Sequence, residues 1–311
     1  MRTSTARVSP PGTRLGLVII AILLLGVGIA PCQHGPQPEV EPNNTPATAT
    51  VLVPEDWELW FFGVPGAISP AGDVDYFQIP VQAGNRLWLL VDTGGTTLPG
   101  ATSRDSVLEV LAPDGSTVLE QDDDDGTGNG HGMVISSLDA SAIAGLVAPS
   151  TGSYFLRVAA KNPTDVIAPY VLMVGMSTTT PGPETEPNDT MGQAQSAWLS
   201  VLGSLSSDTD LDWYDLNLMD AGVPFVIVDG DPERDGISTD VMIDFEPGWP
   251  MPQVNSSTGS GSPPPPAEAL VLPGTPHVCL SGPDAGTYLL FVPYTGDGVP
   301  VPVELMSLEV R

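Results

Sequence analysis

The stretch Ser-Thr-Gly-Ser-Tyr-Phe-Leu-Arg-Val at residues 150–158 returns in altered form as Asp-Ala-Gly-Thr-Tyr-Leu-Leu-Phe-Val at residues 284–292. Both copies begin with turn-forming residues and continue as a run of aromatic and aliphatic side chains, which is the pattern of a strand after a tight turn. Because such a similarity is typical of an internally duplicated chain, the remaining sequence has to be compared with itself before a fold is assigned.

Four further blocks repeat in the same order along the chain, and each is a short apolar or alternating run bounded by Gly, Pro, Asp or Asn. The paired blocks are residues 39–45 with 184–190, 72–77 with 209–214, 86–92 with 224–229, and 104–110 with 239–245. These runs have the pattern of strands, and no long stretch after residue 40 keeps a helical period. The sequence therefore predicts an all-β protein of two tandem antiparallel β-sandwich domains.

Composition changes mark the expected domain boundaries. We expect a first sandwich at residues 39–176, a linker at 177–183 (STTTPGP) and a second sandwich at 184–311. A stretch rich in Pro, Ser and Gly at about residues 247–276 predicts a disordered surface loop in the second sandwich. The segments 47–52 and 191–202 could each begin with a helical turn.

The N-terminus has the layout of an export signal. Three Arg residues precede the uncharged apolar segment 15–30, so residues 1–31 are predicted to be a signal peptide or membrane anchor, with a tether at 32–38. Residues 29–32 (Ile-Ala-Pro-Cys) resemble a bacterial lipobox apart from Pro31, which makes Cys32 a candidate for lipidation. Soluble secretion and an uncleaved anchor are the alternatives. The other cysteine, Cys279, is expected to be a small core residue, and the alternative is a disulfide with Cys32.

The charge balance excludes whole classes of partner. The chain carries 38 acidic residues against 9 basic ones, for a formal net charge of −29. Such a surface repels nucleic acids and anionic lipid headgroups but attracts divalent cations. We therefore expect an exported protein of the cell envelope or the extracellular space that contacts a membrane only through its N-terminal lipid or anchor.

The repeated blocks bring carboxylates together in pairs. Residues two apart in an extended chain face the same side, and a Pro-imposed turn adds amide or carboxylate oxygens. Oxygen ligands without His or Cys suit calcium rather than zinc or copper. The alternative is an ordinary turn followed by a solvated strand. The candidate ligands are Glu39, Glu41, Asn43, Asn44, Asp73 and Asp75 in the first unit, and Glu184, Glu186, Asn188, Asp189, Asp210 and Asp212 in the second.

Two other features carry less chemistry. The run Asp122 to Asp125 does not fit an EF-hand loop, and we expect a solvated acidic turn there. The three His residues stand apart at positions 34, 131 and 277, and no hydrolase or phosphate-binding motif occurs. The sequence thus predicts no catalytic residues, although a hydrolase that uses a carboxylate pair is a weaker alternative.

The motifs Glu-x-Glu-Pro-Asn-Asn/Asp, Gly-Asp-x-Asp-Tyr-Phe and Thr-Gly-Ser-Tyr-Phe-Leu-Arg-Val resemble the bacterial pre-peptidase C-terminal domain, in two tandem copies. This family is related to the calcium-binding C-terminal modules of clostridial collagenases. The resemblance covers nearly everything after residue 38, closely in the first unit and more loosely in the second. It implies a jelly-roll-like sandwich, export and an accessory role, and in the collagenase branch the motif positions named above hold calcium.

We thus expect a non-catalytic, exported protein of two calcium-braced modules that acts as an accessory or binding scaffold at the cell surface. Calcium would brace the N-terminal segment of each module and fix the linker and the relative orientation of the modules. The alternative is an adhesion module that binds an extracellular protein or polysaccharide through exposed aromatic side chains, for which Trp57, Trp60 and Trp249 are the candidates.

Overall fold

The structure, a computed structural model, describes residues 37–53, 60–93, 100–123, 141–178, 180–197, 199–216, 223–235, 239, 241–245, 254–255, 267–271, 277–283, 285–292 and 294–295. The predicted signal segment, Cys32 and most of the tether lie outside these residues. So do Trp57 and Trp249. None of the helices in the described part of the chain has the length and hydrophobicity needed to cross a bilayer.

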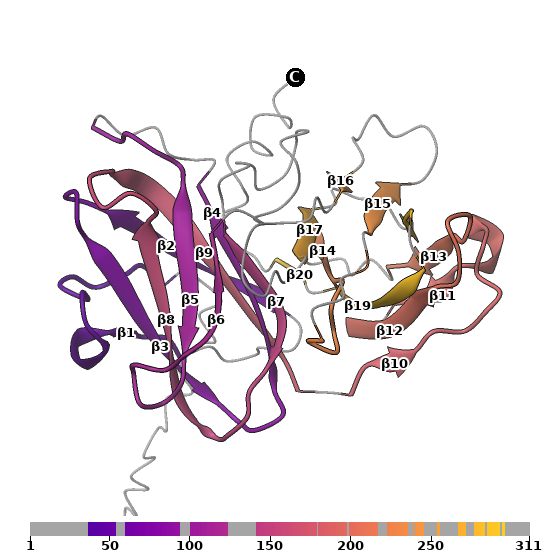
Figure 1. The fold of residues 1–311 in the computed structure, drawn as a ribbon, viewed down its shortest axis with the longest axis horizontal. Coiled ribbons are helices and arrows are strands. Elements are labelled where there is room, and N and C mark those ends of the chain that lie inside the picture. Colours follow the sequence, from indigo (N-terminus) through magenta and orange to yellow (C-terminus); the bar gives the residue numbers. More distant parts are fainter. Residues whose placement is uncertain are drawn as a thin grey trace, which may run out of the picture. The chain divides into compact units, whose positions relative to one another are not determined.

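The first half of the chain folds into two facing sheets (Figure 1). The first sheet contains, in spatial order, β1 (Thr50–Val51), β3 (Val74–Val81), β8 (Gly152–Ala160), β5 (Ser106–Leu111) and β6 (Val118–Asp122). The second contains β2 (Trp60–Ile68), β9 (Ile167–Ser177), β4 (Arg86–Asp92) and β7 (Ala142–Val147).

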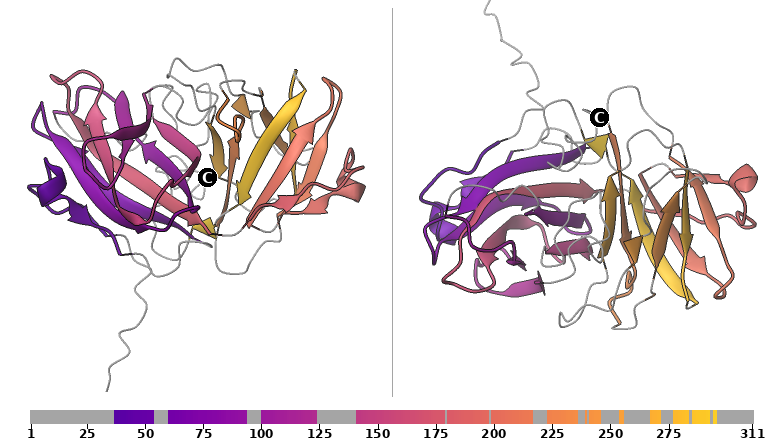
Figure 2. Two further views of the ribbon diagram at one scale, coloured as in Figure 1. Left: turned by 60° about the horizontal axis from the view of Figure 1, so that its bottom comes forward. Right: turned by 90° about the horizontal axis from the view of Figure 1, so that it is seen from above.

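The second half repeats this arrangement (Figure 2). One sheet has the order β11 (Gln195–Ser196), β13 (Asp212–Asp215), β18 (His277–Ser281), β15 (Met242–Phe245) and β16 (Val254–Asn255). The other contains β10 (Gly182–Pro183), β12 (Leu199–Leu205), β19 (Gly286–Val292), β14 (Val223–Asp229) and β17 (Ala267–Val271). The short strand β20 (Tyr294–Thr295) pairs with both β14 and β2, so that one ten-stranded sheet runs through both halves.

The matching strand orders confirm the all-β architecture and correct one detail of the predicted repeat. Four blocks correspond as expected, but the block at residues 150–158 does not correspond to 284–292. Residues 150–158 contain most of β8, and the strand in the equivalent position of the second half is β18. Residues 284–292 lead into β19, which is the counterpart of β9. The local similarity misled because strands after tight turns share a pattern whichever sheet they join.

Several local expectations can be compared with the structure. The helical turns after the two acidic motifs are present as the 3-10 helices η1 (Pro46–Thr48) and η2 (Met191–Gln193). The sandwiches are not purely antiparallel, because β1 pairs with β3, β11 with β13, and β10 with β12 in parallel. β16 and β17 lie inside the segment predicted as a disordered loop, and β17 forms five pairs with β14, so this segment is not wholly irregular.

The strand β4 sends alternate side chains into two different cores. Leu87, Leu89 and Val91 belong to the apolar cluster inside the first sandwich. Trp88 and Leu90 belong to a second cluster, whose members come mainly from the second sandwich. A strand that is buried on both faces reads as a continuous apolar run rather than as an alternation, which explains the sequence RLWLLV.

Cys279 lies in β18 with 3% of its surface exposed, and its thiol is free. Burial raises the pKa of this thiol to about 12, so it stays protonated at neutral pH. The residue packs as the small apolar side chain that was predicted, and it is not part of a disulfide with Cys32.

Candidate metal centre

The acidic motif of each half is fixed between two strands by backbone hydrogen bonds. Glu39 donates its amide N–H to the Pro65 carbonyl at 3.0 Å, and Tyr76 donates its amide N–H to the Asn43 carbonyl at 2.9 Å. The second half repeats both bonds, from Glu184 to the Leu202 carbonyl and from Trp213 to the Asn188 carbonyl, each at 3.0 Å. The motif therefore bridges β2 and β3 in the first half, and β12 and β13 in the second.

Each motif forms an acidic cluster with the strand that follows it. Glu39, Glu41 and Asp75 each offer an oxygen within 4.8 Å of the others. Glu184, Glu186 and Asp212 do the same in the second half. Oxygens at such separations can share one ion, because calcium–oxygen distances are about 2.3–2.6 Å. Of the twelve predicted ligands, these six carboxylates form the two triplets.

The Asn of each motif completes its cluster. One terminal atom of the buried Asn43 amide lies 3.0 Å from Asp75 Oδ1 and 3.2 Å from Glu41 Oε2. This atom is either the NH₂ group, which donates to both carboxylates, or the amide oxygen, which then joins them as a cation ligand. In the second half the buried oxygens Asn188 Oδ1 and Asp212 Oδ1 have no hydrogen-bond partner. Such orphaned oxygens fit a site that receives a cation.

Asp73 and Asp210 have a different role from their neighbours two residues later. Asp73 Oδ2 accepts a hydrogen bond from the Ser69 amide at 3.0 Å, and Asp73 Oδ1 accepts one from the Asn44 side chain at 2.5 Å. Asp210 Oδ2 likewise accepts the Ser206 amide at 2.5 Å, and Asp189 lies beside Asp210. Both aspartates thus accept hydrogen bonds from the turn that precedes the strand and fix the conformation of that turn beside the cluster. They are not members of the two closest carboxylate triplets.

A buried tyrosine in each half contacts the acidic cluster. The Tyr170 hydroxyl donates to Asp75 Oδ2 at 2.6 Å, and the Tyr288 hydroxyl donates to Asp212 Oδ2 at 2.7 Å. These tyrosines lie in β9 and β19, directly opposite Gly66 and Gly203 respectively. A Cβ atom at Gly66 would lie 2.5 Å from the Tyr170 ring, and one at Gly203 would lie 2.4 Å from the Tyr288 hydroxyl. Each tyrosine side chain therefore occupies space that is available only because the opposite residue is glycine.

Sequence reasoning missed both tyrosines, because β19 was aligned with β8 rather than with β9. The sequence signal that could have revealed them is the glycine inside each opposite strand, Gly66 in β2 and Gly203 in β12. A glycine in a strand interior often marks the close approach of another group.

The two clusters differ at one aromatic position. The second half has Tyr214, whose hydroxyl donates to Glu184 Oε1 at 2.7 Å and lies 2.5 Å from the Tyr288 hydroxyl. The first half has Phe77 at the equivalent position, with no hydroxyl to offer. The second cluster is therefore held by one more hydrogen bond to a carboxylate that also belongs to the closest triplet.

Burial raises the pKa values of carboxyl groups in both clusters and so opposes their full ionisation. Burial raises the pKa of Asp75 to about 9, and the charge of Glu39 adds to the increase. Burial is also the main reason why the pKa of Asp212 rises to about 8 and why the pKa of Glu39 is raised. Without a cation, each cluster therefore retains a proton at neutral pH.

The donor set fits a hard divalent cation. Each cluster offers carboxylate and amide oxygens with no His or Cys, which suits calcium. Asp75 and Asp212 are fully buried, and each has one oxygen engaged by a tyrosine. A general acid has to reach its substrate, so this burial argues against Asp75 and Asp212 as the acid of a hydrolase.

The run at 122–125 differs from the solvated turn that was predicted. Asp122 ends β6 with 1% of its surface exposed, and its Oδ2 accepts the Ala142 amide at 2.6 Å. Asp123 forms an ion pair with Lys161. Asp124 and Asp125 lie outside the described residues. The prediction of a solvated turn is therefore wrong for Asp122, which connects β6 to β7.

Comparison with known proteins gives a family match and several distant structural similarities, two of which are described below. Residues 73–160, which contain β3 to β8, match the family model of the bacterial pre-peptidase C-terminal domain. No curated protein matches the chain significantly. A periplasmic inhibitor of g-type lysozyme, PliG from Aeromonas hydrophila, is 15% identical with a TM-score of 0.28, and the alignment covers 42% of this chain and 97% of the inhibitor.

The second structural similarity is to the CUB1-EGF-CUB2 domains of rat MASP-1. Identity is 9% and the TM-score is 0.24, with 78% of this chain and 99% of the other covered. Both TM-scores are too low to support a conclusion about function.

Proposed function

We propose that the protein is a non-catalytic, exported scaffold in which each sandwich is braced by a calcium ion at its N-terminal motif. The observation that best supports this proposal is the pair of equivalent clusters, Glu39/Glu41/Asp75 and Glu184/Glu186/Asp212, each closed by a buried Asn. The family match over residues 73–160 supports an accessory β-sandwich module, and the export signal predicted from the sequence supports a place at the cell surface or outside the cell.

In the first sandwich, the proposed ion would connect two segments that are separate in the sequence. Glu39 and Glu41 belong to the motif that precedes β1, whereas Asp75 is the second residue of β3. One ion shared by the three carboxylates would therefore tie the start of the sandwich to its interior. Ala67 donates its amide N–H to Glu39 Oε1 at 2.8 Å and holds that carboxylate in place. Bound calcium supplies the positive charge that replaces the retained proton and neutralises the remaining carboxylates.

Calcium is expected to stabilise each sandwich measurably. Extracellular calcium sites commonly have dissociation constants of about 10⁻⁴ to 10⁻³ M. At about 10 mM calcium, each site then gains about 1.4–2.7 kcal/mol. Isothermal titration calorimetry of the full chain should give two calcium ions per chain, and calorimetric melting should give a higher Tm in calcium than in EDTA.

Matched variants assign the response to the clusters. Asp75→Asn should remove one calcium site, Asp212→Asn the other, and the double variant both. Asp208→Asn removes an exposed charge close to the second cluster and should leave both sites intact. Binding of two ions by the double variant, or no heat and no Tm shift with the unmodified chain, would overturn the calcium proposal.

The clusters also predict how stability depends on pH. Asp75 has a pKa of about 9 in the folded chain, well above the value of about 4 of an unfolded Asp. The folded state therefore keeps a proton that the unfolded state has lost, and the resulting stability, complete below pH about 4, is lost as the pH rises towards 9. Asp212 acts in the same direction up to pH about 8.

In EDTA, the Tm should therefore fall from pH 5 to pH 8 more steeply for the unmodified chain than for the Asp75→Asn/Asp212→Asn double variant. Asn mimics the protonated acid, so this double variant should also be the more stable protein in EDTA at pH about 8. Parallel pH profiles of the two proteins would contradict the burial of ionisable carboxylates in the clusters.

Adhesion remains an alternative proposal. The aromatic side chains on which it depends, Trp57, Trp60 and Trp249, lie outside the described side chains, and none of our observations favours adhesion over bracing. Pull-down against insoluble polymers with a Trp249→Ala control tests it, and equal recovery from all matrices counts against it.

A further inference from the structure

The sheet formed by β2, β9, β4 and β7 has a second buried face that its own sandwich does not cover. Trp88, Leu90, Ala142, Ala144 and Met173 belong to a single apolar cluster with residues of the second sandwich. The exposed fraction of each of these side chains is at most 1%. The second sandwich therefore covers an apolar surface that an independent first sandwich would expose to water.

An aromatic contact lies within this cluster. The rings of Trp88 in β4 and Phe291 in β19 stack with centroids 4.6 Å apart and an interplanar angle of 16°. The Trp88 Nε1–H donates to Ser177 Oγ at 3.1 Å, so the indole also has its polar atom satisfied. A ring pair of this kind adds specific geometry to the burial of apolar area.

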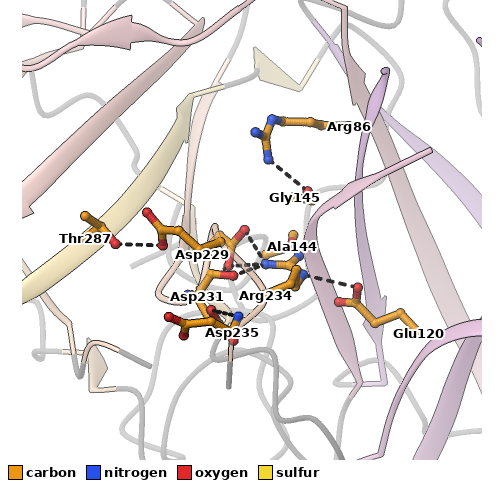
Figure 3. A network of polar contacts seen from close by, with 10 residues as sticks. Arg86, Glu120, Ala144, Gly145, Asp229, Asp231, Arg234, Asp235 and Thr287 are labelled. Carbon is orange, nitrogen blue, oxygen red and sulfur yellow. Dashed lines mark hydrogen bonds and ion pairs between the residues drawn. The ribbon is translucent and has the colours of Figure 1, made fainter. Parts of the chain in front are cut away.

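Arg234 connects the two sandwiches beside this cluster (Figure 3). Its Nη1 donates to both carboxylate oxygens of Asp229 at 2.8 Å, within the second sandwich. Its Nη2 donates to the Ala144 carbonyl, and its Nε lies 3.4 Å from Glu120 Oε2, both in the first sandwich. One guanidinium thus joins a buried carboxylate of one half to two groups of the other.

The backbone of Arg234 has an unusual conformation for a residue with a side chain. Its φ is +57°, in the left-handed region that costs a non-glycine residue energy. A residue keeps such a conformation where surrounding contacts hold it, and Arg234 is held both by its guanidinium contacts and by its amide, which donates to the Asp231 carbonyl at 3.0 Å.

The two halves also approach closely at Gly145 in β7. A Cβ atom there would lie 2.3 Å from Asp229 Oδ2, so no larger residue fits without displacing the carboxylate. Arg86 donates from Nη1 to the Gly145 carbonyl at 3.2 Å on the same face (Figure 3). The contact therefore combines apolar packing with polar groups that are themselves buried, among them Asp229 and Glu120.

We propose that the two sandwiches form one rigid body, and that this interface, rather than calcium, sets their relative orientation. Neither the aromatic stack nor the Arg234 contacts include a residue of the two acidic clusters. Calcium then braces each sandwich internally, while the outer face of the β2–β9–β4–β7 sheet serves as a docking surface for the second sandwich.

The first test compares the full chain in calcium and in EDTA by small-angle X-ray scattering. Measurements at pH about 8 keep the interface carboxylates largely ionised, because burial raises the pKa of Glu120 to about 7 and that of Asp229 to about 6. We expect the same radius of gyration in both conditions and a single calorimetric transition. A larger radius in EDTA alone, or two separate transitions with the unmodified chain, would overturn the proposal.

Variants of the interface provide the second test. Arg234→Met should split the calorimetric transition into two and raise the radius of gyration, whereas Arg157→Met, which removes an ion pair with Glu109 inside the first sandwich, should do neither. Gly145→Ala should act like Arg234→Met. Its control is Gly84→Ala, where φ is also positive (+87° against +70° at Gly145) but no atom lies within 4 Å of the added Cβ.

The second pair keeps the proposal testable if Arg234→Met does not fold. Gly145→Ala that behaves like Gly84→Ala would show that the interface does not hold the sandwiches together. Calcium titration of Gly145→Ala should still show two sites, which separates a failure of this inference from a failure of the calcium proposal.

Discussion

Truncation of Trp88 to alanine is expected to destabilise the protein by about 3–5 kcal/mol, the usual cost of removing a large aromatic side chain from a core. The indole is completely buried, stacks on Phe291 and donates a hydrogen bond to Ser177. The variant therefore leaves a cavity between the two sandwiches and removes an aromatic pair. Equilibrium unfolding in urea, followed by circular dichroism, measures the loss.

A control in the same sheet separates burial from a general effect of truncation. Val147→Ala removes a side chain of β7 that is 42% exposed, and it should change the free energy of unfolding by no more than about 0.5 kcal/mol. A similarly small change for Trp88→Ala would contradict the burial of the indole.

Substitution of Gly66 by alanine is expected to damage the first metal cluster from the opposite strand. The added Cβ would lie 2.5 Å from the Tyr170 ring and 2.7 Å from Glu39 Oε2, so the ring and the carboxylate must both move. Overpacking of this kind typically costs about 1–3 kcal/mol. We also expect the loss of one of the two calcium sites, because the tyrosine and the glutamate both adjoin the cluster.

The repeat supplies an equivalent variant, and η2 supplies a control. Gly203→Ala should displace Tyr288 and remove the second calcium site while the first remains. Gly192→Ala adds a Cβ that meets no atom within 4 Å, and it should leave both sites and the stability unchanged. Calcium titration of the three variants checks these expectations, and two intact sites in Gly66→Ala would contradict the geometry of the cluster.

Much of the fold was predictable because residues typical of turns mark where the strands begin and end. Short apolar runs between Gly, Pro, Asp and Asn predicted the strands, and the order of four repeated blocks predicted the duplication. The register of the fifth block was not predictable in this way. Tyr154 and Tyr288 occupy the same place in similar motifs, yet Tyr154 donates its hydroxyl to the nearby Ser150 carbonyl whereas Tyr288 contacts an acidic cluster.

The sequence predicted which segments form the candidate site, but not the role of each residue within them. Residues two apart in a strand share a face, so Asp73 and Asp75 were expected to act together. In the structure only Asp75 lies within the strand, and Asp73 stays in the preceding turn to accept backbone N–H groups. Alternation describes residues inside a strand and fails for a residue that lies before its first position, as Asp73 does.

The contact between the halves could not be predicted from turn and strand patterns alone. Its signal was the continuous apolar run of β4, where a strand with one solvated face would alternate. Arg234 carried no recognisable motif, since its role depends on Glu120 and Asp229, which lie far apart in the sequence.

Terbium luminescence tests the pair of cation sites most directly. Terbium is a hard cation that takes oxygen ligands as calcium does, and a tyrosine beside the ion transfers excitation energy to it. Tyr170 and Tyr288 contact Asp75 and Asp212, so excitation of tyrosine should produce terbium emission that calcium displaces, with only part of it remaining in either Asp→Asn variant and none in the double variant. Emission that is absent from the unmodified chain, or equally strong in the double variant, would contradict the account.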